Sequence, residues 1–267
     1  MSYNFLIHSN NTPSSKSTEE ILREKLIKAG VSIDEELGTN TDLIVCIGGD
    51  GAFLEAVHAF NFPDTPFVGV NTGHLGFFQE FAPEELDTFI ENFQAEKYVI
   101  QTMTTAKALI EHDHIIDELN ALNEIIVKSD GIHTIHLDIS IGGGLIERFS
   151  GDGVLVSTPA GSTAYNYSLR GSIVDPRLNL LQVTPIAPMN TTAYRSFTSS
   201  ILLPPDLSIE IKPDISGSKG GLLVTYDSYV KEYDSVDRIE IMLSEQEVRL
   251  VRFDNYDFWT KVKTKFL

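Results

Sequence analysis

The stretch DLIVCIGGDGAFLEAVHAF, residues 42–60, decides the fold of the first part of the chain. Its first half is apolar without polar alternation, which is typical of a strand in a parallel sheet that is covered on both faces. The strand pattern ends in Gly48-Gly49-Asp50-Gly51, and a helical pattern follows. Glycine allows a ligand to approach the backbone closely, and a helix start after a strand presents N–H donors to an anion. The stretch therefore predicts an α/β fold with a ligand at the turn.

The sequence on either side of this stretch repeats the alternation of strand and helix. Strands are predicted at YNFLIHS (3–9) and PFVGVN (66–71), and helices at KSTEEILREKLIKAG (16–30), AFLEAVHAF (52–60) and PEELDTFIENF (83–93). Continuous apolar strands between helices indicate a parallel sheet with helices on both faces. We therefore expect a Rossmann-like α/β domain over residues 1–98.

After residue 98 the pattern changes to short strands that are divided by turn residues. Such spacing is typical of an antiparallel, sandwich-like β domain, which we expect over residues 99–251. A short helical insert is predicted after STPAGSTAY. The tail, residues 252–267, has a helical pattern, and we expect this helix to pack back on the first domain. The strands are predicted at 106–112, 123–129, 132–142, 148–158, 207–213, 221–228, 238–245 and 247–253.

Composition excludes several classes of protein. The chain of 267 residues has 38 acidic and 20 basic residues and a net charge of −18, which argues against a nucleic-acid surface. It has no run of ~18 apolar residues, so neither a membrane-spanning helix nor a membrane partner is expected. The start lacks a signal-peptide pattern, and the single Cys46 is expected to be a small buried hydrophobe. These features predict a cytoplasmic protein.

The glycine turn matches neither the P-loop nor the Gly-x-Gly-x-x-Gly pattern. Its distinguishing residue is Asp50, because a carboxylate beside phosphates can coordinate Mg²⁺ or accept a proton from an attacking hydroxyl. The alternative is a tight turn in which Asp50 caps the following helix. The four residues alone leave both interpretations open.

A second candidate site lies at Asn123 and Glu124, which interrupt an apolar strand. Asn123 can donate and accept hydrogen bonds, and an ionised Glu124 can only accept them. The pair could bind sugar hydroxyls or an adenine amino group. The alternative is a strand end at which both side chains face solvent.

A third candidate is SGDGVLVSTPAGSTAYNYSLRG, residues 150–171. Asp152 lies in a second glycine turn, and strand alternation would place it on one side with Arg148 and Ser150. A helix is expected to begin at Ser162 or Thr163. These hydroxyls could serve only as caps of that helix.

The order of these motifs along nearly the whole chain resembles the NAD kinase family. The resemblance implies transfer of the terminal phosphate of ATP or polyphosphate to the 2′-hydroxyl of the adenosine ribose of NAD, with Mg²⁺ or Mn²⁺ required. It also implies an α/β domain followed by a β-rich domain, and a homodimer or homotetramer. The motifs that carry it are GGDG (48–51), GVNTGHLGFF (69–78), LNE (122–124), SGDGVLVSTPAGSTAYNYSLRG (150–171) and TPIAPMN (184–190).

The resemblance also implies a role for each matching residue. Asp50 matches the proton acceptor, and the phosphate donor would lie beside Gly48, Gly49, Gly51 and Asp227. No fixed protein metal site is expected, and the cation would accompany the phosphates near Asp50. The residues that would contact NAD are Asp50, Gly51, Phe77, Phe78, Asn123, Glu124, Ser150, Asp152, Ala160, Thr163, Ala164, Tyr165, Asn166, Ser168 and Ala187.

Some positions depart from the family pattern. Ala52 stands where Thr is usual, Ala160 where many relatives have Thr, and Ser150 where a basic residue is frequent. We expect these departures to affect the choice of phosphate donor and the affinity more than the reaction itself. Two alternatives remain at this point: a lipid- or sugar-type kinase that shares the GGDG turn, and a non-catalytic NAD-binding regulator.

Overall fold

The computed structural model describes residues 3–129, 131, 133–192, 195–214, 221–254 and 256–267. The chain forms two compact units, which we call unit 1 (Met1–Met103 with Glu247–Leu267) and unit 2 (Thr104–Gln246). The boundaries fall within two long strands, β6 (Val99–His112) and β17 (Arg238–Arg252). The domain limits predicted at residues 98 and 251 stay a prediction.

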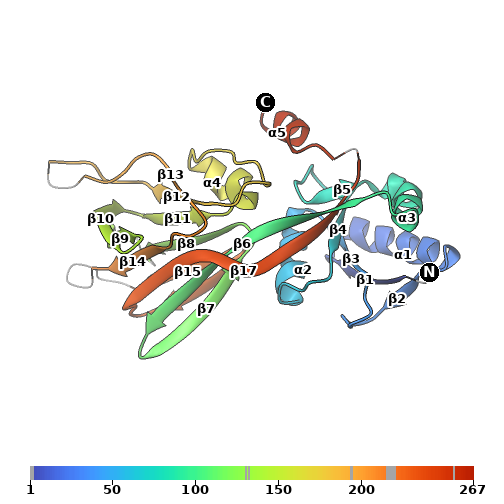
Figure 1. The fold of residues 1–267 in the computed structure, drawn as a ribbon, viewed down its shortest axis with the longest axis horizontal. Helices are drawn as coiled ribbons and strands as arrows, with labels where there is room; N and C mark the ends of the chain where they lie inside the picture. Colours follow the sequence, from blue (N-terminus) through green and yellow to red (C-terminus); the bar gives the residue numbers. More distant parts are fainter. Residues whose placement is uncertain (1–2, 130, 132, 193–194, 215–220, 255) are drawn as a thin grey trace. The chain divides into compact units, whose positions relative to one another are not determined.

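Unit 1 contains the parallel sheet that the apolar runs predict (Figure 1). Its strands are ordered β2-β1-β3-β4, with β5 paired to β4 and Leu250 of β17 paired to Phe67. The strands are β1 (Asn4–Ser9), β2 (Ser32–Asp34), β3 (Leu43–Gly48), β4 (Phe67–Asn71) and β5 (Gln79–Phe81). The helices α1 (Pro13–Lys28) and α2 (Asp50–Ala59) lie between these strands in the chain, and η1 (Pro83–Glu85) and α3 (Leu86–Gln94) follow β5.

Aromatic and aliphatic side chains fill the core of unit 1. Phe89 of α3 packs its ring 5.3 Å from that of Phe81 and 6.2 Å from that of Phe253, and all three are buried. All six residues of β3 are buried, as its unbroken apolar pattern predicts. Cys46 is free and buried, and burial raises the pKa of its thiol, so the prediction of a small buried hydrophobe is confirmed.

The C-terminal helix α5 (Phe258–Phe266) belongs to unit 1, as the sequence predicts. The rings of Phe258 and Phe266 each lie 5.8 Å from the ring of Phe77, and Val262 between them is buried. The helix therefore packs on the segment that follows β4. None of the helices in the described parts of the chain is long and apolar enough to cross a membrane.

Unit 2 is built from two antiparallel sheets. One has the strand order β13-β12-β11-β8-β15-β16, and the other runs β10-β9-β14-β17, with the β6-β7 hairpin paired to β17. The first sheet comprises β8 (Glu124–Ser129), β11 (Gly153–Ser157), β12 (Leu181–Ile186), β13 (Ile201–Leu203), β15 (Leu222–Tyr226) and β16 (Tyr229–Tyr233). The second comprises β7 (Ile115–Ala121), β9 (Ile135–Ile141), β10 (Gly144–Gly151) and β14 (Ile209–Pro213) with β6 and β17.

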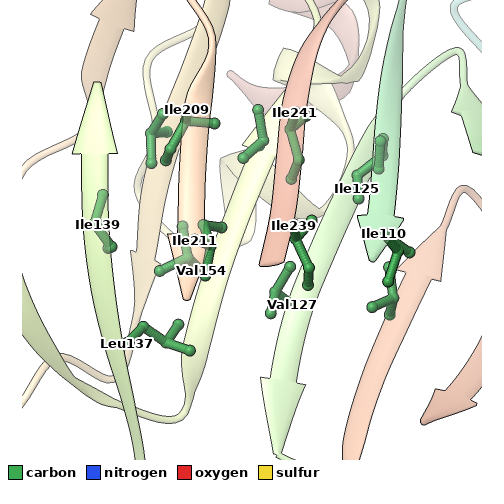
Figure 2. Packing of buried hydrophobic residues seen from close by; sticks show 14 of the residues in the cluster. Ile110, Ile125, Val127, Leu137, Ile139, Val154, Ile209, Ile211, Ile239 and Ile241 are labelled. Atoms are coloured by element: carbon green, nitrogen blue, oxygen red, sulfur yellow. The ribbon is translucent and has the colours of Figure 1, made fainter. Parts of the chain in front are cut away.

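The two sheets of unit 2 share one aliphatic core. Figure 2 shows Ile125 and Val127 of β8 gathered with Ile239 and Ile241 of β17 and with side chains of the neighbouring strands. These four residues alternate along their strands with residues that point away from this core, and the four are buried. The predicted antiparallel sandwich is confirmed, and together with unit 1 it gives the expected α/β class.

Candidate functional site

The glycine turn after β3 leads directly into α2, and its carboxylate is tied to a distant backbone segment. Gly49 is the N-cap residue of α2, which begins at Asp50, and the cap has no side-chain hydrogen bond. Asp50 Oδ2 accepts from the amide of Phe77 (3.0 Å) and Oδ1 from the amide of Phe78 (3.1 Å). The helix-capping interpretation of Asp50 is therefore wrong. The carboxylate instead joins the GGDG turn to the GHLGFF segment.

This connection depends on Gly76. A Cβ at Gly76 would lie 2.3 Å from Asp50 Oδ1 and 3.1 Å from Gln79 Cγ, so only glycine fits there. Gln79 is buried, and neither atom of its amide has a hydrogen-bond partner among the described residues. Nothing in the sequence distinguishes Gln79 from an ordinary strand residue, and it was not predicted as part of the site.

The phenylalanines of GHLGFF are mainly core residues. Phe77 and Phe78 are both buried, and the Phe78 ring stacks on Phe53 of α2 at 4.7 Å. Their backbone amides hold Asp50, while the Phe77 ring faces α5. The contact with NAD that the family resemblance implies for them stays a prediction.

Two lysines of α5 reach this segment, and sequence reasoning missed both. Lys261 Nζ donates to the carbonyl oxygens of Gln79 and Phe77, the latter at 3.4 Å. Burial lowers the pKa of Lys261 to about 8, while Glu80 opposes this effect. Lys265 Nζ lies 3.7 Å from Asp50 Oδ2. No local sequence pattern indicates a lysine beside the GGDG turn, because Lys265 comes from the C-terminal helix.

Asn123 and Glu124 form a second polar group, in unit 2. Both are only 7% exposed, and Asn123 Oδ1 and Glu124 Oε2 have no hydrogen-bond partner among the described residues. The interpretation of this pair as a solvent-facing strand end is therefore wrong. Buried polar atoms without partners are costly, so this pair is suited to a ligand that supplies the missing hydrogen bonds.

Asp227 holds the backbone of this pair. Its Oδ1 accepts from the amide of Asn123 at 2.7 Å, and its Oδ2 accepts from the amide of Leu122 at 2.9 Å. Its own amide donates to the carbonyl of Glu124 at 3.1 Å. Asp227 has a φ of 51°, in the left-handed region that Asp tolerates better than most residues. Its role near the phosphate donor stays a prediction.

Glu124 is expected to be protonated near neutral pH. Burial, followed by the negative charge of Asp227, raises the pKa of Glu124 to about 8. A protonated carboxyl has one O–H donor, so Glu124 can donate as well as accept. The expectation that it only accepts is therefore corrected for the protein without ligand.

The raised pKa predicts a pH-dependent stability. The unfolded chain releases the Glu124 proton at the ordinary Glu pKa, whereas the folded chain keeps it up to about pH 8. The free energy of unfolding should therefore fall as the pH rises between these values. Urea unfolding at pH 5 and pH 7.5 should show a smaller fall in Glu124→Gln than in the unmodified protein. Glu232→Gln, on the exposed side of β16, is the control and should behave like the unmodified protein.

The polar residues at the end of β10 differ in their exposure. Arg148 is exposed and pairs with Asp138 at 2.8 Å, whereas Ser150 is fully buried. Asp152 lies after the end of β10 and is exposed. The expectation of one polar side is wrong for Asp152, because β10 ends at Gly151 and the strand alternation does not continue beyond it. Arg148 and Ser150 lie two residues apart in β10, opposite Asp138 and His136 of β9.

Ser150 is fixed within the β domain. Its hydroxyl lies 2.8 Å from Nδ1 of His136, and its backbone amide donates to Ser196 Oγ at 3.0 Å. Asp152 donates its amide to the carbonyl of Ile186, next to Ala187, which is exposed and has a φ of 45°. The NAD contacts proposed for Ser150, Asp152 and Ala187 stay predictions.

The predicted helical insert is present as a 3₁₀ turn, η2 (Ala160–Thr163), followed by α4 (Tyr165–Ser168). Neither segment has a side-chain cap at its start, so the interpretation of the Ser162 and Thr163 hydroxyls as helix caps is wrong. Ser162 Oγ donates to the carbonyl of Val174 at 3.2 Å and accepts from its amide at 3.0 Å. The insert is thereby fixed to the segment that follows it.

The residues of this insert differ in exposure. Asn166 is fully buried, and its amide donates to two carbonyls and accepts from Thr184 Oγ1 at 2.7 Å. Thr163 is buried, Tyr165 is 44% exposed and Ser168 is exposed, while Ala160 and Ala164 are half-buried. A Cβ at Gly161 would lie 2.1 Å from the carbonyl oxygen of Asn123, so the insert contacts the Asn123–Glu124 pair closely.

The chain matches two family models along its length. The ATP-NAD kinase N-terminal domain matches residues 4–98, and the ATP-NAD kinase C-terminal domain matches residues 122–253. An NAD kinase of Finegoldia magna is 38% identical, over 98% of this chain and 97% of the relative. NAD kinase 1 of Oceanobacillus iheyensis is 34% identical, over 99% and 98%.

Solved structures show the same fold. Yeast NADH kinase complexed with NADH superposes with a TM-score of 0.85 and 23% identity, over 99% of this chain and 87% of the other. An NAD kinase from Archaeoglobus fulgidus in complex with ATP gives a TM-score of 0.74 and 23% identity, over 99% of both chains.

Proposed function

The chain belongs to the NAD kinase family, and from this we propose that it transfers the terminal phosphate of ATP to the 2′-hydroxyl of the adenosine ribose of NAD, giving NADP. The relatives named above are NAD kinases, and one of the similar structures holds ATP while another holds NADH. Neither a lipid- or sugar-type kinase nor a non-catalytic regulator is favoured by these matches. The observation in this chain that carries the proposal is the buried pair Asn123 and Glu124, in which Asn123 Oδ1 and Glu124 Oε2 have no hydrogen-bond partner among the described residues.

In the proposed reaction, one bond forms and one bond breaks at the terminal phosphorus of ATP. The ribose 2′-oxygen forms a bond to the terminal phosphorus of ATP, the bond between that phosphorus and the bridging oxygen breaks, and ADP leaves. The hydroxyl proton passes to Asp50, whose carboxylate the amides of Phe77 and Phe78 hold in one orientation. Fixing the base in this way reduces the entropy lost on reaching the transition state.

The phosphate donor is proposed to lie at the start of α2. Among the described residues no side chain caps α2 at Gly49, and its first-turn amides are proposed to donate to the phosphates. Gly49 and Gly51 are proposed to let the phosphates approach the backbone closely, because a Cβ at either would meet no atom within 4 Å. The space beside Gly48 is instead filled by Ala52 and Asn10. Polyphosphate could occupy the same donors, so the choice of ATP rests on the family.

A divalent cation, Mg²⁺ or Mn²⁺, is proposed to accompany the phosphates and to neutralise part of their charge. Among the described residues, no three His, Cys, Asp or Glu side chains form a group that could hold a metal ion. The phosphates would supply oxygen ligands of the kind that such a hard cation prefers. The cation would thus lie near Asp50 without occupying the carboxylate that takes the proton.

NAD is proposed to bind the polar groups of unit 2 through its ribose hydroxyls and amide. Asn123 and Glu124 would bind the nicotinamide-side ribose, with further contacts from Asp152, Ala187 and the insert. Asp227 would hold the backbone of Asn123 and Glu124 in position. It is also proposed to lie near the phosphate donor. The insert residues with proposed contacts are Ala160, Thr163, Ala164, Tyr165, Asn166 and Ser168. The protein is further proposed to be cytoplasmic and to form a homodimer or homotetramer.

Asn123→Ala and Glu124→Ala test this assignment. Each variant should weaken NAD binding by about 1–3 kcal/mol, because a buried hydrogen-bonding group of the complex loses its partner. Isothermal titration calorimetry with NAD measures the change, and Lys128→Ala in the same strand is the control. Unchanged NAD affinity in both variants would show that the pair does not contact NAD.

A further inference from the structure

The C-terminal helix α5 is firmly seated on the segment that holds Asp50. Asp257 caps the helix, since its carboxylate accepts from the amides of Trp259 (3.2 Å) and Thr260 (3.1 Å). Phe258 and Phe266 pack against Phe77 from the two ends of the helix. The position of α5 beside Asp50 is therefore supported by apolar packing and by the hydrogen bonds of Lys261, and it does not depend on the contact of Lys265.

One face of α5 carries two lysines toward this segment. Lys261 and Lys265 are four residues apart and so lie one above the other. Lys261 is the more buried of the two and donates to backbone carbonyls of the GHLGFF segment and the residue after it. One turn further on, Lys265 Nζ lies 3.7 Å from Asp50 Oδ2 and 4.7 Å from the centre of the Phe77 ring.

The contact between Lys265 and Asp50 contributes little to stability. The two side chains are 35% and 28% exposed, and ion pairs in such positions are worth about 0–1 kcal/mol. The contact matters because it places a positive charge beside the carboxylate of Asp50. Within the described parts of the chain, Lys265 is the only basic side chain within ion-pair distance of Asp50. An ammonium group has three N–H donors, so one contact with Asp50 leaves donors for an anion.

We propose that Lys265 binds the phosphate that meets Asp50, and that it offsets the repulsion between this phosphate and the carboxylate. The inference rests on the proposed function. The chain has a net charge of −18, so an anionic nucleotide gains from a local positive charge at the turn. The lysine would act together with the first-turn amides of α2, which carry no formal charge.

Kinetics of three variants test this proposal. Lys265→Ala should lower kcat/KM for ATP roughly 10- to 100-fold, the size expected for loss of a hydrogen bond to a charged group. Lys265→Arg should restore most of this loss, because the charge is kept. The KM for NAD should not change. Lys263→Ala, an exposed lysine on the same helix, is the control and should match the unmodified protein.

Binding of inorganic tripolyphosphate, measured by calorimetry, separates this proposal from the proposed function. Weaker binding by Lys265→Ala than by Lys263→Ala would support the lysine site, whether or not the protein phosphorylates NAD. Equal tripolyphosphate binding and equal kcat/KM for ATP in these two variants would overturn it. An equal loss of activity in Lys265→Ala and Lys265→Arg would also overturn it, since the charge would then not be what matters.

Discussion

Asp50→Asn is expected to lower kcat about 10²- to 10⁴-fold, because the amide cannot accept the proton of the attacking hydroxyl. The substitution keeps the size of the side chain. It leaves one acceptor oxygen where the structure uses two, for the amides of Phe77 and Phe78. One of these amides therefore loses its partner, and a modest loss of stability should accompany the loss of turnover.

Steady-state kinetics and thermal unfolding of Asp50→Asn separate the two effects. Glu55→Gln, at an exposed position of the same helix, is the control and should keep both turnover and stability. NAD binding by the Asn variant, measured by calorimetry, would verify that the variant is folded. Near-normal turnover in Asp50→Asn would remove Asp50 from the mechanism and leave it only the structural role.

Arg252→Met is expected to destabilise the protein by about 3–5 kcal/mol, the cost of leaving the partner of a buried ion pair without its counter-charge. Arg252 and Glu80 are 3% and 2% exposed and are hydrogen-bonded to each other. Burial raises the pKa of Glu80 and the charge of Arg252 opposes this, so removing Arg252 favours the protonated carboxyl. Arg252 also donates to Gln101 at 2.7 Å and lies over the Tyr256 ring.

Urea unfolding measures this effect, and Lys25→Met provides the comparison. Lys25 pairs with Asp87 at the surface of unit 1, where loss of the pair should cost about 0–1 kcal/mol. The double variant Arg252→Met with Glu80→Met should recover most of the lost stability, because neither charge of the buried ion pair remains. A free energy of unfolding for Arg252→Met no lower than that for Lys25→Met would contradict this account.

The apolar runs allowed the fold class and most of unit 1 to be predicted. β3 and β4 lack polar alternation because both faces are covered, and the turn between β3 and α2 is set by local glycines. Hairpin strands that contain polar residues were harder to predict from the sequence. β7 contains Asp117, Glu118 and Asn120, which have low strand propensity, and it forms because it pairs with β6 over seven residues. β17 crosses Ser244–Gln246 as one strand, where the sequence predicted two.

The candidate site could be predicted only as far as its motifs reach. Asp50, Asn123 and Glu124 follow from short patterns in the sequence, and Asp227 follows from the resemblance to the family. The contacts of Asp50 with amides 27 and 28 residues away, and with Lys265 on the last helix, follow from tertiary packing that no local pattern encodes. The burial of Asn123 and Glu124 likewise depends on the strands beside them.

The most direct test of the proposed function is NADP formation by the purified protein. Reactions would contain ATP and Mg²⁺ with NAD, diacylglycerol or fructose 6-phosphate as acceptor, with and without excess chelator. Of the three acceptors, we expect only NAD to be phosphorylated, which gives NADP. Activity should be lost in excess chelator and should return when Mg²⁺ or Mn²⁺ is added. Phosphorylation of the lipid or the sugar in place of NAD, or NAD binding without any NADP formed, would contradict the account.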